Sequence, residues 1–104
     1  GAKFRRKTMP TLTRFDMAEY LDSEELIIEY LNQSFEDEDP KAFLKALGTV
    51  ARARGMSDLA RKTGIPRESL YHALSEKGNP SWSTLRKITD ALGVSLSLRP
   101  ASAV

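Results

Sequence analysis

The stretch MSDLARKTGIPRESLYHALSEKGNPSWSTL, residues 56–85, constrains the fold more than any other part of the sequence. It contains three helical patterns of two or three turns, interrupted by Gly-Ile-Pro and by Lys-Gly-Asn-Pro. Helices this short are unstable in isolation, so they must be held by packing against each other. Two short helices joined by a turn that contains Gly pack at a steep angle, with the first bracing the second. The stretch therefore predicts a helix-turn-helix within residues 56–75.

Capping residues and apolar stripes predict five helices in all. The expected spans are 22–35, 39–54, 58–63, 66–75 and 81–92. They open at Asp22, Asp39, Ser57, Pro66 and Ser81. Gly55, Gly64 and Gly93 stand where the second, third and fifth helices should end. The aromatic residues on the stripes are expected in the core, namely Tyr30, Phe35, Phe43 and Trp82.

Two segments show the alternation of a β-strand. Residues 94–99 alternate Val94, Leu96 and Leu98 with polar residues, and residues 11–15 show a weaker signal of a strand or an extended arm. The expected fold class is thus all-α, with five helices and a short C-terminal β-strand. A chain of 104 residues supports one core, so residues 11–104 are expected to form a single domain. Residues 1–10 are expected to be a flexible basic N-terminus or an artificial extension.

The amino-acid composition and the distribution of charge limit the classes of function that the protein can have. The absence of cysteine excludes disulfides and thiol nucleophiles and favours a reducing cytoplasm. The sequence contains no apolar run of the length that a membrane span or a signal peptide requires, so neither is predicted. Residues 9–48 hold three basic and ten acidic side chains, whereas residues 49–104 hold nine basic and four acidic ones. This segregation suggests two different partners, the basic half facing a polyanion, unless the charges only form solvated faces.

Nothing in the sequence predicts catalysis. His72 is the only histidine and has no carboxylate cluster near it in the sequence, so neither a metal site nor a cofactor is expected. A triad of Ser83, His72 and Asp90 can be drawn, but it lacks a nucleophile elbow or an oxyanion loop. We therefore expect a binding protein rather than an enzyme.

The wider sequence resembles a known family. LARKTGIPRESLYHALSEKGNPSWSTLRKITDALGVSL is similar to the phage-repressor, Cro-like helix-turn-helix proteins. Upstream, RFDMAEYLDSEELIIEYLNQSFEDEDPKAFLKALGTVARARGMSDLA resembles the subgroup of addiction-module antidote proteins. The resemblance implies a lambda-repressor-like domain in an antitoxin that neutralises a RelE-like ribonuclease toxin and represses its own operon.

The resemblance also implies particular site residues. Carried over, the base-contacting positions fall on Arg67, Glu68, Tyr71 and His72. The phosphate-contacting positions fall on Arg54, Ser57, Arg61, Ser81 and Thr84, and Ser69 is expected to contact a phosphate or a thymine. Pro66 replaces a hydroxyl residue found in many relatives, which removes one contact where the second helix begins. Glu68 lowers affinity for DNA unless it meets a cytosine amino group.

Partner surfaces are also expected. The acidic segment should face a basic toxin through Glu36, Asp37, Glu38 and Asp39. The alternative is a protein-interaction module that masks a basic partner without specific DNA binding. Because such proteins bind two half-sites, a homodimer is expected, with a contact near residues 92–98. The C-terminal strand would pair there with its symmetry mate or with the N-terminal arm.

Overall fold

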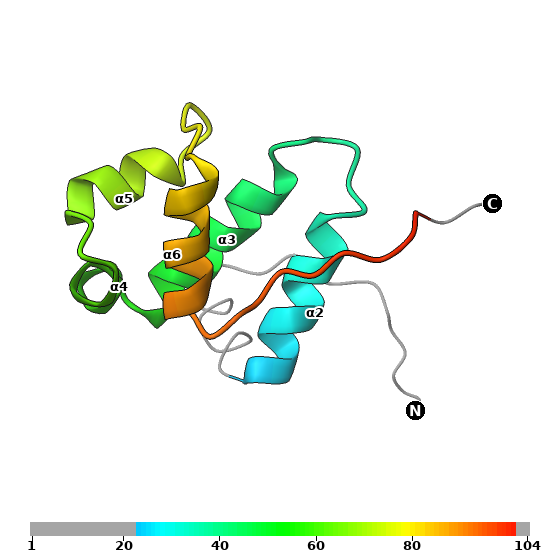
Figure 1. Ribbon diagram of the computed structural model, residues 1–104, viewed down its shortest axis with the longest axis horizontal. Helices are drawn as coiled ribbons and strands as arrows, with labels where there is room; N and C mark the ends of the chain where they lie inside the picture. The colour runs from blue at the N-terminus through cyan, green and yellow to red at the C-terminus, as the bar shows by residue number, and fades with distance from the viewer. Residues whose placement is uncertain (1–22, 102–104) are drawn as a thin grey trace.

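Five α-helices follow one another through residues 23–101, which are the residues that the computed structural model describes (Figure 1). They are α2 (Glu24–Ser34), α3 (Ala42–Arg54), α4 (Met56–Thr63), α5 (Arg67–Ala73) and α6 (Trp82–Ala91). All five predicted helices are present within residues 23–101. The expected features of residues 1–22, including the 11–15 strand and the Asp22 cap, lie outside the described residues.

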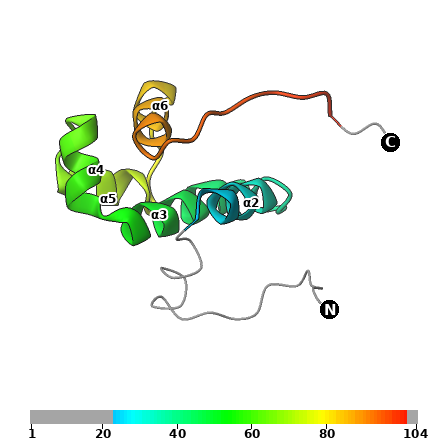
Figure 2. The ribbon, with the colours of Figure 1, turned by 90° about the horizontal axis from the view of Figure 1, so that it is seen from below.

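The helix α3 lies in the middle of the fold. It packs against α2 on one side and against α4 on the other, and α4 in turn contacts α5 and α6. Figures 1 and 2 show α4 and α5 together at one end of the molecule, with α6 between them and the C-terminal segment. This arrangement leaves the outer sides of α5 and α6 facing solvent.

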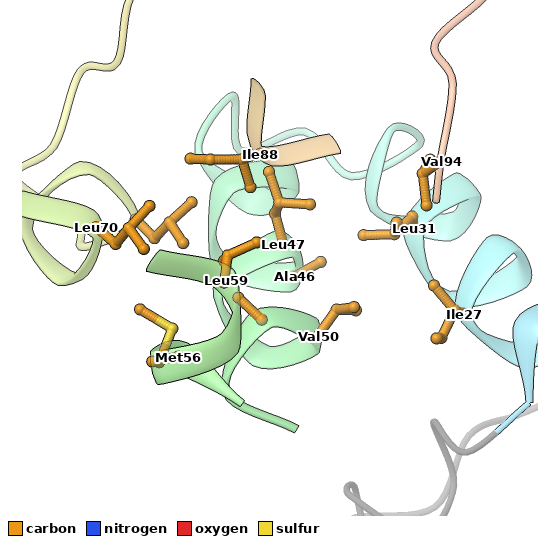
Figure 3. Close-up of a cluster of buried hydrophobic side chains, with 12 residues drawn as sticks. Ile27, Leu31, Ala46, Leu47, Val50, Met56, Leu59, Leu70, Ile88 and Val94 are labelled. Atoms are coloured by element: carbon orange, nitrogen blue, oxygen red, sulfur yellow. The ribbon is translucent and has the colours of Figure 1, made fainter. Parts of the chain in front are cut away.

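One apolar cluster joins all five helices (Figure 3). Its fully buried side chains include Leu47 and Val50 of α3, Leu59 of α4, Leu70 of α5 and Ile88 of α6. Each such side chain stabilises the fold by about 1.5–3 kcal/mol through its removal from water. Ile27 and Leu31 connect α2 to the same cluster. The expected apolar stripes are therefore the core-facing sides of the helices.

The helix starts agree with the capping residues only in part. Ser81 Oγ accepts a hydrogen bond from Thr84 N at 3.1 Å and caps α6 as expected. In α2 the cap is Ser23, whose Oγ accepts from Leu26 N at 3.1 Å. Asp39 does not cap α3, which begins later, at Ala42. The Asp39 carboxylate accepts instead from Lys41 N at 2.9 Å and closes a turn before the helix.

Two further boundaries differ from the expected ones. The α4 helix begins at Met56 rather than Asp58, because Gly55 O already accepts from Leu59 N at 3.1 Å and starts the helical pattern. The α5 helix ends at Ala73, two residues short of the expected end. Helix ends depend on such local hydrogen bonds, which periodicity cannot specify.

The predicted C-terminal strand is wrong, since residues 94–101 form no strand. Val94 N donates to Thr89 O at 2.9 Å, and the Val94 side chain is buried near Leu31 (Figure 3). Beyond Val94, alternation alone cannot make a strand, which needs a hydrogen-bonding neighbour. Residues 23–101 supply no such neighbour, and Leu98 is 100% exposed. We call residues 94–100 the tail.

Two aromatic residues expected in the core are exposed. Trp82, the first residue of α6, is 60% exposed, on the side of the helix that lies beside the tail. Phe35 is 57% exposed because it follows the last turn of α2. Tyr30 and Phe43, by contrast, are half-buried and pack against the cluster, as expected.

Candidate nucleic-acid interface

A three-residue turn, Gly64 to Pro66, joins α4 to α5. Gly64 has the left-handed φ of 76°, and its N–H donates to Ala60 O at 2.9 Å, which ends α4 as predicted. Thr63 Oγ1 accepts from Ile65 N at 3.1 Å and donates to Leu59 O at 2.8 Å. These hydrogen bonds fix the direction in which α5 leaves the turn.

One side of α5 is inside the protein and the other is in solvent. Leu70 is its only buried side chain. The four predicted base-contacting residues, Arg67, Glu68, Tyr71 and His72, are all exposed, as is Ser69. Their spacing along the helix sets residues 67 and 71 one above the other, with 68 and 72 beside them. The structure therefore brings these four side chains together on one accessible surface.

Arg67 connects the two short helices. Its Nη1 donates to Ser57 Oγ on α4 at 3.0 Å, and its Cζ lies 5.8 Å from the centroid of the Tyr71 ring. The contact with Tyr71 is a cation–π interaction, which is weak at an exposed site. Both contacts restrict the rotamers of Arg67 and hold its guanidinium group at the junction of α4 and α5. Arg67 and Ser57 were each predicted to contact DNA, but their mutual hydrogen bond was not predicted.

Asp58 also belongs to this surface, although it was not among the predicted residues. Its carboxylate pairs with Arg61 and, at 3.2 Å, with Lys62. The hydrogen bond from Lys62 is the main cause that lowers the pKa of Asp58, so this carboxylate is ionised at neutral pH. Its spacing of three and four residues from Arg61 and Lys62 was the readable signal. Exposed pairs of this kind are weak, so a phosphate can replace Asp58 as the partner of Arg61.

The remaining predicted phosphate contacts lie at helix ends. Ser81 and Thr84 form the first turn of α6, where Ser81 Oγ caps the helix and also donates to Thr84 Oγ1 at 3.1 Å. Arg54 is exposed in the last turn of α3. Among residues 23–101, no hydrogen bond or ion pair connects Arg54 to the other predicted contacts.

The four predicted toxin-facing acids lie in the exposed turn between α2 and α3. Asp37 and Asp39 also stabilise the turn itself, since Asp37 Oδ1 accepts a hydrogen bond from Asp39 N at 2.8 Å. Asp39 also pairs with Lys45 at 3.4 Å, and the hydrogen bond from Lys41 N is the main cause that lowers its pKa. Glu36 and Glu38 form no ion pair within the described part of the chain. The acidic turn therefore keeps most of its charge available to a partner.

An aromatic pair lies directly beside the acidic turn. The rings of Phe35 and Phe43 stack with centroids 4.4 Å apart and an interplanar angle of 13°. They line a groove of about 340 Å³ whose other walls include Pro80 and Leu85. Asp37 and Asp39 line the same groove. The surface around residues 35–43 therefore combines apolar and acidic side chains.

Other kinds of site are not evident in residues 23–101. No group of three or more His, Asp or Glu side chains there is placed to hold a metal ion. No hydrogen bond in this range joins Ser83, His72 and Asp90 into the triad that the sequence allowed. None of the described helices combines the length and apolar character that crossing a bilayer requires.

Comparisons with known proteins identify the class. A family model described as "Probable addiction module antidote protein" matches residues 11–100, which is most of the chain. The chain belongs to this family. A Haemophilus influenzae (strain ATCC 51907 / DSM 11121 / KW20 / Rd) protein described as uncharacterized is 47% identical over 88 residues, covering 85% of this chain and 91% of that protein. No solved structure gives a significant match.

Family membership bears on the partner. An antidote acts against a toxin, so the family implies a cognate toxin partner. The resemblance to antidote proteins is confirmed, whereas membership of the Cro-like family stays a prediction.

Proposed function

We propose that this protein is the antitoxin of a type II toxin–antitoxin module, in which it neutralises a RelE-like toxin and represses its own operon. In this proposal α4, the 64–66 turn and α5 form a helix-turn-helix, and α5 is the recognition helix. The observation that carries the DNA-binding part is the outward display of Arg67, Glu68, Tyr71 and His72 on an α5 anchored by Leu70.

The chemistry of these side chains suits the major groove, which is about 12 Å wide and admits an α-helix. Arg67 would donate two hydrogen bonds to guanine O6 and N7, and Glu68 would accept from a cytosine amino group. His72 can donate or accept according to its tautomer. Tyr71 would contact a base edge, and Ser69 a phosphate or a thymine. Because Ser57 and Tyr71 already restrict Arg67, less of its rotamer entropy would be lost on binding.

Phosphate contacts would surround the recognition helix. Arg61 would exchange Asp58 for a backbone phosphate, while Ser57 and Arg54 would contact the same strand from the α3–α4 junction. At α6, the backbone amides near Ser81 and Thr84 suit an anion. Asp58 and Glu68 oppose the three basic residues of α4 and α5. We therefore expect weak binding to random DNA. The preference for the upstream DNA over random DNA should depend on the base contacts.

The test of the DNA-binding part is substitution of Arg67. Arg67→Ala should weaken binding to the DNA upstream of its own gene by about 1–3 kcal/mol. Arg67→Lys keeps the charge but loses the two-pronged hydrogen bond, so it should keep affinity for random duplex and lose most of the sequence preference. Fluorescence anisotropy with labelled duplexes measures both effects.

The control is Arg52→Ala, which removes one exposed positive charge from α3 outside the helix-turn-helix. The Arg52→Ala variant should keep the preference for the upstream duplex over random duplex. Equal behaviour of the Arg52 and Arg67 variants on both duplexes would show that α5 does not read the sequence.

The toxin-binding part rests on the acidic turn and the aromatic groove beside it. A RelE-like toxin has a basic RNA-binding surface, so Glu36, Asp37, Glu38 and Asp39 offer charge complementarity and fast association. The stacked Phe35 and Phe43 would accept an apolar side chain of the toxin. The same surface supports the second candidate function, a protein-interaction module without specific DNA binding, because it lies away from α5 (Figure 1).

Neutralising the turn tests this surface. The triple variant Glu36→Gln, Asp37→Asn, Glu38→Gln spares Asp39, which closes the turn through Lys41. We expect slower association with the toxin and a weaker dependence of the association rate on salt. Surface plasmon resonance at three salt concentrations measures both quantities.

The matched control neutralises three exposed acids on α2, with Glu24→Gln, Glu25→Gln and Glu29→Gln. In this control variant, the salt dependence of the association rate with the toxin should fall less than in the turn variant. If the turn variant binds the toxin as the unaltered protein does, the acidic turn has no part in the complex.

A further inference from the structure

The groove beside the acidic turn is built from two connections that lie far apart in the sequence. Its aromatic and acidic residues belong to the α2–α3 connection and the helix ends beside it, whereas Asn79 and Pro80 belong to the α5–α6 loop. Both connections lie at the top of the view in Figure 1. Lys41 Nζ donates to Gly78 O at 2.8 Å and joins one connection to the other. The two parts of the groove are therefore held together without a partner.

The aromatic residues of the groove offer a flat apolar face. The rings of Phe35 and Phe43 are stacked, so each covers one face of the other. Phe35 nevertheless remains 57% exposed, which leaves its second face and its edge accessible. The face of an aromatic ring carries partial negative charge and attracts a cation placed over it. Phe35 therefore suits a flat, positively charged group as well as an apolar one.

Asp37 and Asp39 add full negative charges to the same groove. Asp37 forms no ion pair within residues 23–101, and Asp39 pairs there with Lys45 alone, at 3.4 Å. An exposed pair of this kind is weak, so Asp39 can exchange Lys45 for another cation. An apolar side chain would suit the rings, but it would remove water from both carboxylates without pairing them, which is costly. The occupant that fits the whole groove therefore carries a positive charge.

Arginine is the side chain that suits both the rings and the carboxylates. Its guanidinium group is planar and always charged, so it stacks on aromatic faces and donates two parallel hydrogen bonds to a carboxylate. Its three methylene groups can contact Pro80 and Leu85, the apolar residues that line the groove from the α5–α6 loop and from α6. Lysine has a compact and strongly hydrated ammonium group, which lacks both the flat face and the paired hydrogen bonds.

We propose that this groove is a binding site for one arginine side chain of the cognate toxin. The inference rests on the proposed function for the identity of the partner, and it adds the chemistry of the residue that anchors the complex. The guanidinium group stacks on Phe35 and pairs with Asp37 and Asp39, while Glu36 and Glu38 attract the basic surface around it. An arginine held in this way is the type of residue that dominates the affinity of an interface.

The variant Phe35→Leu separates an arginine anchor from an apolar one. Leucine keeps an apolar side chain at this position but removes the aromatic face. Affinity for the toxin should therefore fall by about 3- to 10-fold, because the cation–π contact is lost. Asp37→Asn keeps the acceptor for Asp39 N and removes the charge, so affinity should fall by at least as much. Surface plasmon resonance gives the dissociation constants, and circular dichroism checks folding.

The matched control is Ile28→Leu, because Ile28 is another exposed apolar residue of α2 and does not line the groove. This variant should bind the toxin as the unaltered protein does. If Phe35→Leu also binds the toxin with unchanged affinity, the arginine anchor is wrong although the toxin-binding function stands.

A titration without toxin tests the groove by itself. The probe is the blocked peptide acetyl-Ala-Arg-Ala-amide, compared with peptides in which lysine or citrulline replaces arginine. Citrulline has nearly the shape of arginine but no charge. In ¹H–¹⁵N NMR spectra of the full chain, the arginine peptide should shift the amide signals of residues 35–43 and 79–85. It should bind at least about 5-fold more tightly than the other two peptides, and Phe35→Leu should weaken its binding.

The peptide titration decides the inference even if the unaltered protein binds no toxin, a result that would count against the proposed function instead. No shift with the arginine peptide, equal binding of the three peptides, or shifts confined to residues outside the groove would each overturn the arginine site.

Discussion

Leu70→Ala is expected to lower the free energy of unfolding by about 2–5 kcal/mol. Leu70 is 0% exposed and is the only side chain through which α5 enters the core. A helix of seven residues has no stability of its own, so the cavity left by this change detaches α5 as well as weakening the core. Urea denaturation followed by circular dichroism gives the stability.

Tyr71→Ala is the matched control, since it truncates the neighbouring exposed residue of the same helix. Its stability should remain within about 0.5 kcal/mol of the unaltered protein. If Leu70→Ala is no less stable than Tyr71→Ala, α5 is not held by the contact that the structure assigns to it.

Gly78→Ala is expected to cost about 3 kcal/mol of stability, at the upper end for overpacking. A Cβ at this position would overlap the backbone carbonyl oxygens of His72 and Ala73, which cannot move without shifting the end of α5. The loop is also fixed from the other side, because Lys41 Nζ donates to Gly78 O at 2.8 Å. The change should therefore alter the position of α5 relative to α6 and weaken DNA binding as well.

The control is Asn79→Ala, in the same loop. Comparing the thermal denaturation of the two variants separates the effect of a Cβ against the end of α5 from a general effect of changing the loop. Asn79 is the exposed neighbour, and its truncation should change stability little. Similar melting temperatures for the two variants would contradict the tight approach of the loop to α5.

The order and number of the helices could be predicted because their local signals are strong. Gly64 has the left-handed conformation that its place after α4 predicted, and Ser81 caps α6. The prediction at Asp39 is wrong because its carboxylate accepts a hydrogen bond in a turn instead, three residues before α3 begins. The choice between a cap and a turn is decided by hydrogen bonds that the sequence pattern does not distinguish.

Burial near helix ends was harder to predict. Periodicity identifies the side of a helix that faces inward, but it does not say how far the neighbouring helices extend. Trp82 and Phe35 both lie on apolar stripes, yet Trp82 is 60% and Phe35 57% exposed, the first at the start of α6 and the second just after the end of α2. The tail shows the same limit, because alternation of Val94, Leu96 and Leu98 predicts a strand only where a second strand is available.

The sequence could predict which side chains α5 exposes, but not the contacts that they make; their role in binding DNA stays a prediction. Exposure of Arg67, Glu68, Tyr71 and His72 agrees with their positions around Leu70. The hydrogen bond from Arg67 to Ser57 depends on the angle at the 64–66 turn, which no spacing rule gives. The contacts of Asp58 with Arg61 and Lys62 are local, and helical spacing alone would have revealed them.

Competition between two duplexes tests whether this antidote protein binds its own operator through α5. One duplex carries the DNA upstream of its own gene, and the other carries the same bases in shuffled order. Affinity for both should fall as salt increases, because phosphate contacts contribute to both. The upstream duplex should be preferred at every salt concentration, and Arg67→Lys should remove most of this preference. Equal affinity of the unaltered protein for the two duplexes at all salt concentrations would rule out sequence reading by α5.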